Sequence, residues 1–175
     1  MLVVADTSPI NYLVLIQQEI LLPALYGRVV IPPAVYEELQ RSQTPAEVRQ
    51  WVVHPPAWLT VQPPQQTLYA GHFPKLGAGE REAIPLAQEL PDAVLIIDDH
   101  DGREEAARRR IAMIGTIGVL EAAATRGLID LSPVLAQLQA TTFHASPRLF
   151  AEVLARDAAR KASPPTDGRV PAHCG

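Results

Sequence analysis

Three aspartates stand within four residues directly after an apolar run in the middle of the chain. The run at 94–97 contains only Val, Leu and Ile, and Asp98, Asp99 and Asp101 follow it. Such a run is typical of a strand buried on both faces of a parallel sheet. Ligands of open α/β sheets bind where strands leave the sheet, and clustered carboxylates repel one another unless protons or cations intervene. The sequence therefore predicts a divalent-metal site at this strand end.

A second apolar run, at the N-terminus, also ends in an acid. Residues 2–5 read Leu-Val-Val-Ala and Asp6 follows. Ser8 is a plausible helix N-cap and Pro9 a first helical residue, so Asp6 is expected in a strand-to-helix turn. Taken alone, Asp6 could simply cap this helix. Its role as a ligand depends on whether other acids converge on it.

Glu38 lies in a predicted helix that runs from residue 34 to about residue 41. At 100° per residue Val35, Tyr36 and Leu39 share one side, Glu38 borders that side, and Glu37 points away from it. Glu38 is therefore the acid of this helix that can face inward. The alternative is a solvated side chain at the edge of an amphipathic helix.

Glu80 starts another predicted helix, and its own face is apolar. The residues three, four and seven positions later are Ala83, Ile84 and Ala87, whereas Glu82 is expected to face outward. A carboxylate on a buried face is unfavourable unless it is paired, hydrogen-bonded or bound to metal. Glu80 is thus the most informative single acid, although it could instead complement the helix dipole.

The elements that must position these acids alternate between strands and helices. Further short strands are expected at 28–31, 58–61 and 111–114, and helices at 102–110 and 117–126 and after Ser132-Pro133 and Ser146-Pro147. Residues 65–76 are expected to form a loop that flanks the site. This alternation predicts an α/β fold, a three-layer α/β/α sandwich with a mostly parallel central sheet.

Arginines cluster in the helix that follows the central acids. Glu104 with Arg108 and Glu105 with Arg109 have the four-residue spacing of helical ion pairs, which favours a solvated, self-paired face. Contact with RNA phosphate is the alternative. Arg103, the closest arginine to the acids, is the best candidate for that contact.

Composition sets wide limits on the protein. The chain has 175 residues, 47% of them hydrophobic, and a net charge of -4, so any nucleic-acid contact needs a local basic patch. The single Cys174 allows no internal disulfide, and no apolar run reaches the roughly 20 residues of a membrane span. We expect a cytoplasmic protein with no membrane segment, one domain over residues 1–160 and a disordered tail over 161–175.

Five short motifs occur in an order that resembles the PIN-domain nucleases, in particular the branch of VapC-type toxins from toxin–antitoxin pairs. The motifs cover residues 1 to about 155. They are Val-Ala-Asp-Thr-Ser-Pro at 4–9, Ile-Pro-Pro-Ala-Val-Tyr-Glu-Glu-Leu at 31–39, Gly-Glu-Arg-Glu-Ala-Ile at 79–84, Leu-Ile-Ile-Asp-Asp at 95–99 with Arg103 and Ala106, and Gly-Thr-Ile-Gly-Val-Leu at 115–120.

The resemblance implies an acidic quartet formed by Asp6, Glu38, Glu80 and one of the Asp98/Asp99 pair. Asp99 is slightly favoured as the direct ligand; Asp101 could take part through water, and Ser8 and Thr116 could hold acids or water in place. Glu80 replaces an Asp common among relatives, which lengthens its reach by one methylene.

A site of carboxylate oxygens suits Mg²⁺ or Mn²⁺, which can activate water for phosphodiester hydrolysis. The resemblance further implies endoribonuclease activity, a homodimer and inhibition by a cognate antitoxin.

Other protein classes fit parts of the pattern. A phosphoacceptor receiver-like domain also has acids at strand ends, but its paired acids follow the first strand, whereas here a lone Asp comes first. A catalytically weak PIN-like module that binds RNA or regulates is the main alternative, and the intact acid set argues against it. A metal-dependent DNA or flap nuclease could share the site, but the chain is short for strand-threading elements.

Overall fold

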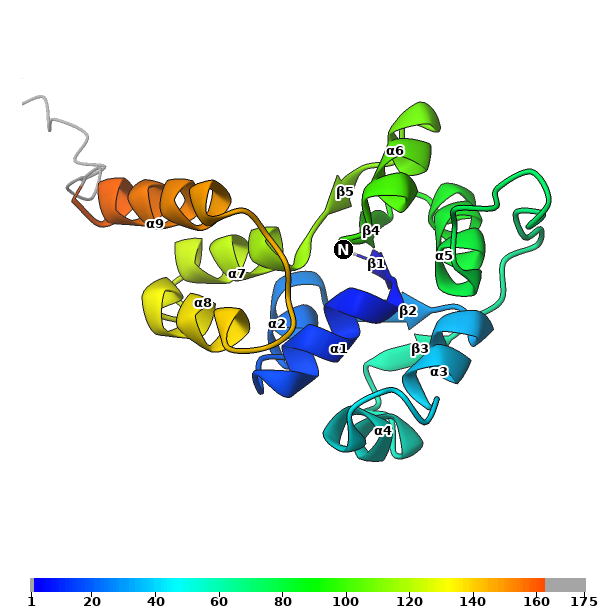
Figure 1. The fold of residues 1–175 in the computed structure, drawn as a ribbon, viewed down its shortest axis with the longest axis horizontal. Helices are drawn as coiled ribbons and strands as arrows, with labels where there is room; N and C mark the ends of the chain where they lie inside the picture. The colour runs from blue at the N-terminus through cyan, green and yellow to red at the C-terminus, as the bar shows by residue number, and fades with distance from the viewer. Residues whose placement is uncertain (1, 163–175) are drawn as a thin grey trace, which may run out of the picture.

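A computed structural model describes residues 2–162, and the fold is built around one parallel sheet (Figure 1). The elements in chain order are β1 (Leu2–Ala5), α1 (Thr7–Leu15), α2 (Leu21–Tyr26), β2 (Arg28–Ile31), α3 (Pro33–Leu39), α4 (Ala46–Val53), β3 (Leu59–Val61), α5 (Ala78–Glu89), β4 (Val94–Ile96), α6 (His100–Arg108), β5 (Met113–Ile114), α7 (Thr116–Thr125), α8 (Leu131–Gln139) and α9 (Pro147–Ala162).

The sheet has five strands in the order β3-β2-β1-β4-β5, and each neighbouring pair is parallel. Strand β1 lies in the centre, where Val4 pairs with Val30 on one side and with Leu95 on the other. The Asp6 amide extends this pairing by donating to the Ile96 carbonyl at 3.0 Å. Since parallel strands end at the same edge of a sheet, the residues after β1 and β4 meet there.

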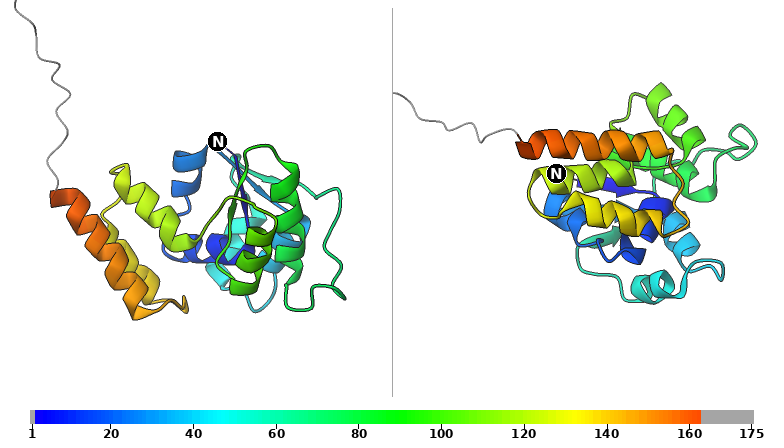
Figure 2. Two further views of the ribbon diagram at one scale, coloured as in Figure 1. Left: turned by 90° about the horizontal axis from the view of Figure 1, so that it is seen from above. Right: turned by 60° about the vertical axis from the view of Figure 1, so that its left-hand side comes forward.

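Helices cover both faces of the sheet, which confirms the predicted α/β/α sandwich. On β1, Val3 and Ala5 belong to one apolar cluster and Val4 to the other, as the two-residue period of a strand requires. Helices α5 and α6 cover the Val4 face. The remaining helices contribute to the larger cluster on the opposite face, and Figure 2 shows α7, α8 and α9 stacked beyond the sheet on that side.

Several helix starts differ from the sequence prediction. Helix α6 begins at His100 and ends at Arg108, two residues ahead of the expected 102–110, and α3 and α7 each begin one residue early, at Pro33 and Thr116. Helix α1 begins at Thr7 with Asp6 in the N-cap position, so Ser8 is not the cap and Pro9 is the third helical residue. Helix α8 begins at Leu131, ahead of the expected Ser132-Pro133 start. Proline is tolerated in both places because amides in the first helical turn have no intrahelical acceptor. Helix α2 was not predicted.

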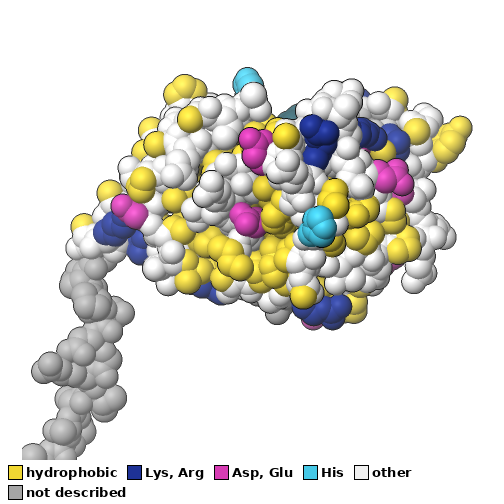
Figure 3. Space-filling view, turned by 90° about the horizontal axis from the view of Figure 1, so that it is seen from below, with side chains coloured by type: hydrophobic (Ala, Val, Ile, Leu, Met, Phe, Trp, Pro, Cys, Tyr) yellow, Lys and Arg dark blue, Asp and Glu magenta, His cyan; other side chains and the backbone are white. Residues whose placement is uncertain are grey.

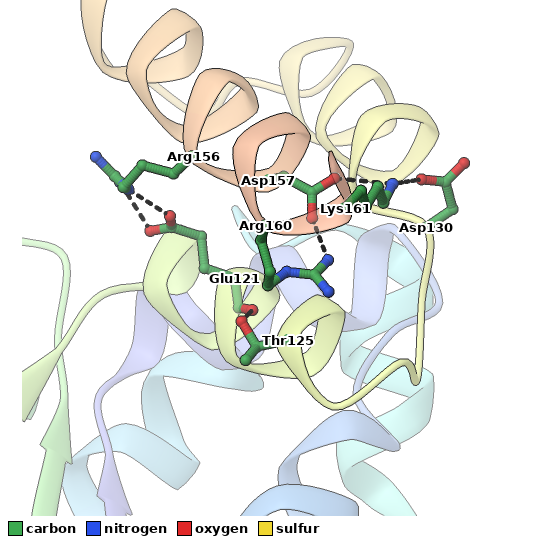
Figure 4. Close-up of polar contacts among 7 residues, drawn as sticks. All are labelled: Glu121, Thr125, Asp130, Arg156, Asp157, Arg160 and Lys161. Carbon is green, nitrogen blue, oxygen red and sulfur yellow. Dashed lines mark hydrogen bonds and ion pairs between the residues drawn. The ribbon is translucent and has the colours of Figure 1, made fainter. Parts of the chain in front are cut away.

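The last helix was predicted correctly at its start: the Ser146 hydroxyl accepts from the Leu149 amide at 3.1 Å at the beginning of α9. Polar contacts hold α9 against α7 and α8 (Figure 4). Arg156 donates to both oxygens of Glu121 in α7, and Lys161 bridges Asp157 and Asp130. Residues 161 and 162 of the predicted disordered tail belong to α9, and the rest of the tail, residues 163–175, lies outside the described residues.

The surface carries some large apolar side chains. Ile20 and Val53 are 61% and 56% exposed, and Leu149 and Leu154 of α9 are each 37% exposed. Figure 3 views the molecule from below relative to Figure 1, from the side on which α4 lies. Hydrophobic side chains gather over a continuous part of that face. Between residues 2 and 162 no helix has the length and apolar character needed to cross a membrane.

Candidate metal-dependent nuclease site

Four carboxylates converge at the carboxyl edge of the sheet from four different elements. Asp6 follows β1, Asp98 follows β4, Glu38 lies in α3 and Glu80 in the first turn of α5. A Cβ atom placed on Gly79 would fall 2.8 Å from both Asp6 Oδ1 and Glu38 Oε2. The acids that were separated by up to about ninety residues in the sequence therefore form one cluster around the N-terminus of α5.

Asp6 is the most buried of these acids, with 2% of its surface exposed. Its Oδ1 atom is buried and accepts no hydrogen bond from the described residues. Burial raises the pKa of Asp6 well above its ordinary value, and the nearby Glu80, Glu38 and Asp98 raise it further, although the Thr7 amide opposes them. In the absence of a cation this carboxylate favours a proton.

Glu38 is held by neighbours from two other helices. The Thr7 hydroxyl of α1 donates to its Oε2, and the Gly79 amide of α5 donates to its Oε1 at 3.1 Å. Arg41 lies 3.7 Å from the same Oε1. Glu38 thus faces the cluster, as its helical position predicted, and it connects α1, α3 and α5.

Glu80 lies close enough to Asp6 and to Asp99 for the charges of these acids to act on one another. Its Oε2 atom is buried without a hydrogen-bond partner among residues 2–162. Burial is the main cause that raises the pKa of Glu80, and the charge of Asp99 is the second. Unpaired, buried oxygens on Glu80 and on Asp6 are the positions where a cation would remove the largest electrostatic penalty.

Asp98 is fixed by the residues that begin α7. The Thr116 amide donates to its Oδ1 at 2.8 Å and the Thr116 hydroxyl to its Oδ2 at 2.6 Å. Burial raises the pKa of Asp98, while Thr116 and the positive charge of Arg103 oppose the increase. Arg103 itself is half-buried and donates to the Ile97 carbonyl at 2.9 Å, so it supports the strand end next to Asp98. Its contact with RNA stays a prediction.

Asp99 and Asp101 lie at the start of α6, further from the centre. Asp99 is exposed and is the N-cap, where its Oδ1 accepts from the Gly102 amide at 2.8 Å. Asp101 lies 3.7 Å from Lys75 of the loop between β3 and α5. Asp98 lies close to Asp6, and Asp99 lies close to Glu80. Either aspartate could therefore be the direct metal ligand.

Three contributors were missed or misjudged from the sequence. Thr7, rather than Ser8, contacts an acid of the cluster, and Gly79 allows the close approach of two carboxylates. The expectation that Glu82 faces outward is wrong: it is half-buried, and its Oε2 accepts from the Ala34 amide at 2.9 Å. That bond satisfies an amide at the start of α3, a role visible only once α3 and α5 are packed together.

The donor set fits a hard divalent cation. It consists of carboxylate oxygens, and two of those oxygens are buried and unpartnered. In the described part of the chain, no three of these side chains are arranged closely enough to bind a metal ion as they stand. The reason is local: Thr7 and Gly79 hold Glu38, Thr116 holds Asp98, and Gly102 holds Asp99. Metal binding would require small movements of these carboxylates.

The crowded position of Gly79 leads to a first prediction. In Gly79→Ala the new methyl group would push the Asp6 and Glu38 carboxylates apart. We expect nuclease activity to fall at least about 10-fold, comparable to the loss of a residue that orients metal ligands. Thermal stability should change little, since Ala favours a helical position by about 1 kcal/mol and offsets part of the crowding. Cleavage rates and melting curves check this, and wild-type activity in the variant would contradict the close packing of the two acids.

The architecture defines an α/β/α domain with a carboxylate cluster at the carboxyl edge of a parallel sheet. A family model described as a PIN domain matches residues 2–158, so the chain belongs to the PIN-domain family. PIN domains are generally nucleases, which assigns the chain at a coarse level to the hydrolases that cleave phosphodiesters. A search of curated proteins finds no match to the chain.

Proposed function

We propose that the protein is a Mg²⁺- or Mn²⁺-dependent endoribonuclease. The observation that carries this proposal is Asp6: its carboxylate is 2% exposed, its Oδ1 has no partner among the described residues, and three other acids surround it. Membership of the PIN-domain family supports the nuclease part of the proposal. A cluster of this charge is unfavourable next to RNA phosphates unless a cation neutralises it.

In this proposal Asp6, Glu80 and one or both of Asp98 and Asp99 hold the metal ion. When bound, the ion supplies positive charge and an activated water for hydrolysis, and Mg²⁺ retains several waters for this purpose. The water oxygen would form a bond to phosphorus as the bond to the 3′-oxygen breaks, and the departing 3′-oxygen would take a proton from solvent. Glu38 also lines the cleft beside the cluster, where it would take the proton that the water loses, and Thr116 keeps Asp98 in place.

The proposal is tested by incubating the purified protein with a mixed RNA pool and with single-stranded DNA. We expect RNA cleavage with Mg²⁺ or Mn²⁺ and none with EDTA. Absence of RNA cleavage with every metal, from folded protein without a bound inhibitor, would reject the endoribonuclease. RNA binding without cleavage would favour the catalytically weak RNA-binding module instead, and cleavage of DNA alone would favour a deoxyribonuclease.

We further propose that this nuclease acts in the cytoplasm as the toxin of a toxin–antitoxin pair and forms a homodimer. The VapC-like motifs support this role, and the continuous hydrophobic area of the face in Figure 3 supports association with another protein surface. Expression without an antitoxin should arrest bacterial growth, and a catalytically inactive variant should not. Light scattering should give twice the mass of one chain; a monomer would contradict the dimer without affecting the nuclease.

A further inference from the structure

A polar cleft opens directly beside the carboxylate cluster, between α1 and the α3–α4 region. Its volume is about 520 Å³, within the range of small-ligand sites. Thr7 and Glu38 of the cluster form one end. The other lining residues are Ser8, Asn11 and Tyr12 from α1, Arg41, Gln43, Thr44 and Pro45 from the α3–α4 connection, and Thr142.

Several hydrogen-bonding groups in the cleft are free. The side chains of Ser8, Asn11 and Gln43 form no hydrogen bond with any residue between 2 and 162. Each amide presents a donor and an acceptor side by side, which is the pattern along the edges of nucleobases. Free amides that line a concave surface next to a reactive centre are suited to read a ligand.

Contacts within the protein hold the wall of the cleft in place before any ligand binds. The Tyr12 ring packs edge-on against Phe143 with centroids 5.0 Å apart, and its hydroxyl lies 3.3 Å from the Thr142 hydroxyl. Thr44 donates to the Glu38 carbonyl at 2.8 Å, and Arg49 donates to the Thr44 carbonyl at 3.1 Å. A site held in place before binding loses less entropy when a ligand enters.

Arg41 supplies the positive charge of the cleft. Among the described residues that line the cleft it is the one cation, it is 56% exposed, and its partner is Glu38 at 3.7 Å. The Glu38 side chain is only 15% exposed, but the contact is long and the Arg41 side chain lies mostly in solvent, so the guanidinium can turn to bind a phosphate.

Two other cavities also have basic groups beside them, but neither cavity is lined by a residue of the Asp6, Glu38, Glu80 and Asp98 cluster. Lys75 and Arg108 contact Asp101 and Glu104 at a cavity of about 280 Å³. Arg156 and Arg160 contact Glu121 and Asp157 at one of about 170 Å³ (Figure 4).

We infer that this cleft binds the nucleotide next to the scissile phosphate of a single-stranded RNA, with Asn11 and Gln43 reading its base and Arg41 binding its phosphate. The inference rests on the proposed endoribonuclease function and adds a determinant of sequence preference. It places the recognised nucleotide on the α1 and α3–α4 side of the acids, rather than beside Arg103 in α6. Each base contact contributes selectivity, and the phosphate contact contributes affinity that is independent of sequence.

The test compares cleavage-site preferences on a randomised RNA pool. In Asn11→Ala and Gln43→Ala we expect the preference of the wild-type protein at one flanking position to weaken about 10-fold, with kcat changed less than about 3-fold. Arg41→Ala should raise KM for all sequences and reduce the salt dependence of RNA affinity by about 0.7 in logarithmic slope, the value for one lost contact with a single strand. Gln50→Ala and Arg28→Ala, exposed residues outside the cleft, serve as matched controls and should behave as wild type.

The outcomes separate this inference from the function on which it rests. Wild-type cleavage with unchanged preference in both amide variants and unchanged KM in Arg41→Ala would overturn the inference and leave the nuclease intact. Loss of preference together with a loss of thermal stability would also count against it, because the side chains would then act by maintaining the fold. If the wild-type protein cleaves no RNA, the proposed function fails and the inference fails with it.

Discussion

Asp6→Asn is expected to abolish metal-dependent RNA cleavage while making the metal-free protein more stable. The substitution keeps the volume of the side chain but removes a ligand charge. Since residues that merely orient metal ligands contribute about 10–100-fold, loss of a direct ligand should reduce kcat by more than about 100-fold. The stability should rise because Asp6 must either take up a proton or carry a buried charge in the folded state and Asn needs neither, and because the new amide can donate to neighbouring Glu80 or Glu38.

Cleavage assays and melting curves in EDTA measure the two effects on one sample. Each kcal/mol of added stability should raise Tm by about 2–4 °C in a domain of this size. Asp92→Asn is the matched control: Asp92 is exposed, and its left-handed backbone (φ 56°) is well tolerated by Asn. It should leave activity and Tm unchanged. An Asp6→Asn protein that still requires metal and cleaves at the wild-type rate would exclude Asp6 as a ligand.

Divalent metal is expected to stabilise the protein strongly, and more strongly at higher pH. At 100 times its dissociation constant a ligand that binds only the folded state adds about 2.7 kcal/mol, or about 5–10 °C in Tm. Burial raises the pKa of Asp6, Glu80 and Asp98, so these groups hold protons more tightly in the folded state than in the unfolded state. Protons therefore compete with the metal.

The raised pKa values of Asp6, Glu80 and Asp98 also determine how the stability of the metal-free protein depends on pH. Below about pH 4 these acids are protonated in both states, and their contribution to stability is fully present. As the pH rises through the higher folded-state pKa values, that contribution is lost. Melting curves in EDTA should thus show Tm falling from weakly acidic to neutral pH, and Mg²⁺ or Mn²⁺ should restore it. In Asp6→Asn, Tm should vary less with pH and should rise less when Mg²⁺ or Mn²⁺ is added. A metal-free Tm that does not vary with pH would contradict the buried cluster.

Local pattern in the sequence was sufficient for the main elements. The apolar runs at 2–5 and 94–97, each followed by an acid, predicted β1 and β4, and helical periodicity placed Glu38 and Glu80 inward. These predictions succeed because strand and helix periods are properties of neighbouring residues. The mostly parallel direction of the strands followed from the alternation of strands and helices, whereas the strand order β3-β2-β1-β4-β5 came only from the structure. The motifs identified the PIN-domain family, and the family model matches residues 2–158.

Contacts between distant segments were decided only by the tertiary structure. Thr7, not Ser8, contacts Glu38 because α1 starts two residues earlier than its Ser-Pro signal suggested. Glu82 faces α3 rather than solvent, and Gly79 leaves room for two carboxylates. The cleft beside Glu38 likewise combines residues from α1, the α3–α4 connection and Thr142. The sequence by itself determined the elements and their inward acids, because those depend on local periodicity. Only the packed fold determined which groups hold those acids and which amides stay free, because these depend on residues far apart along the chain.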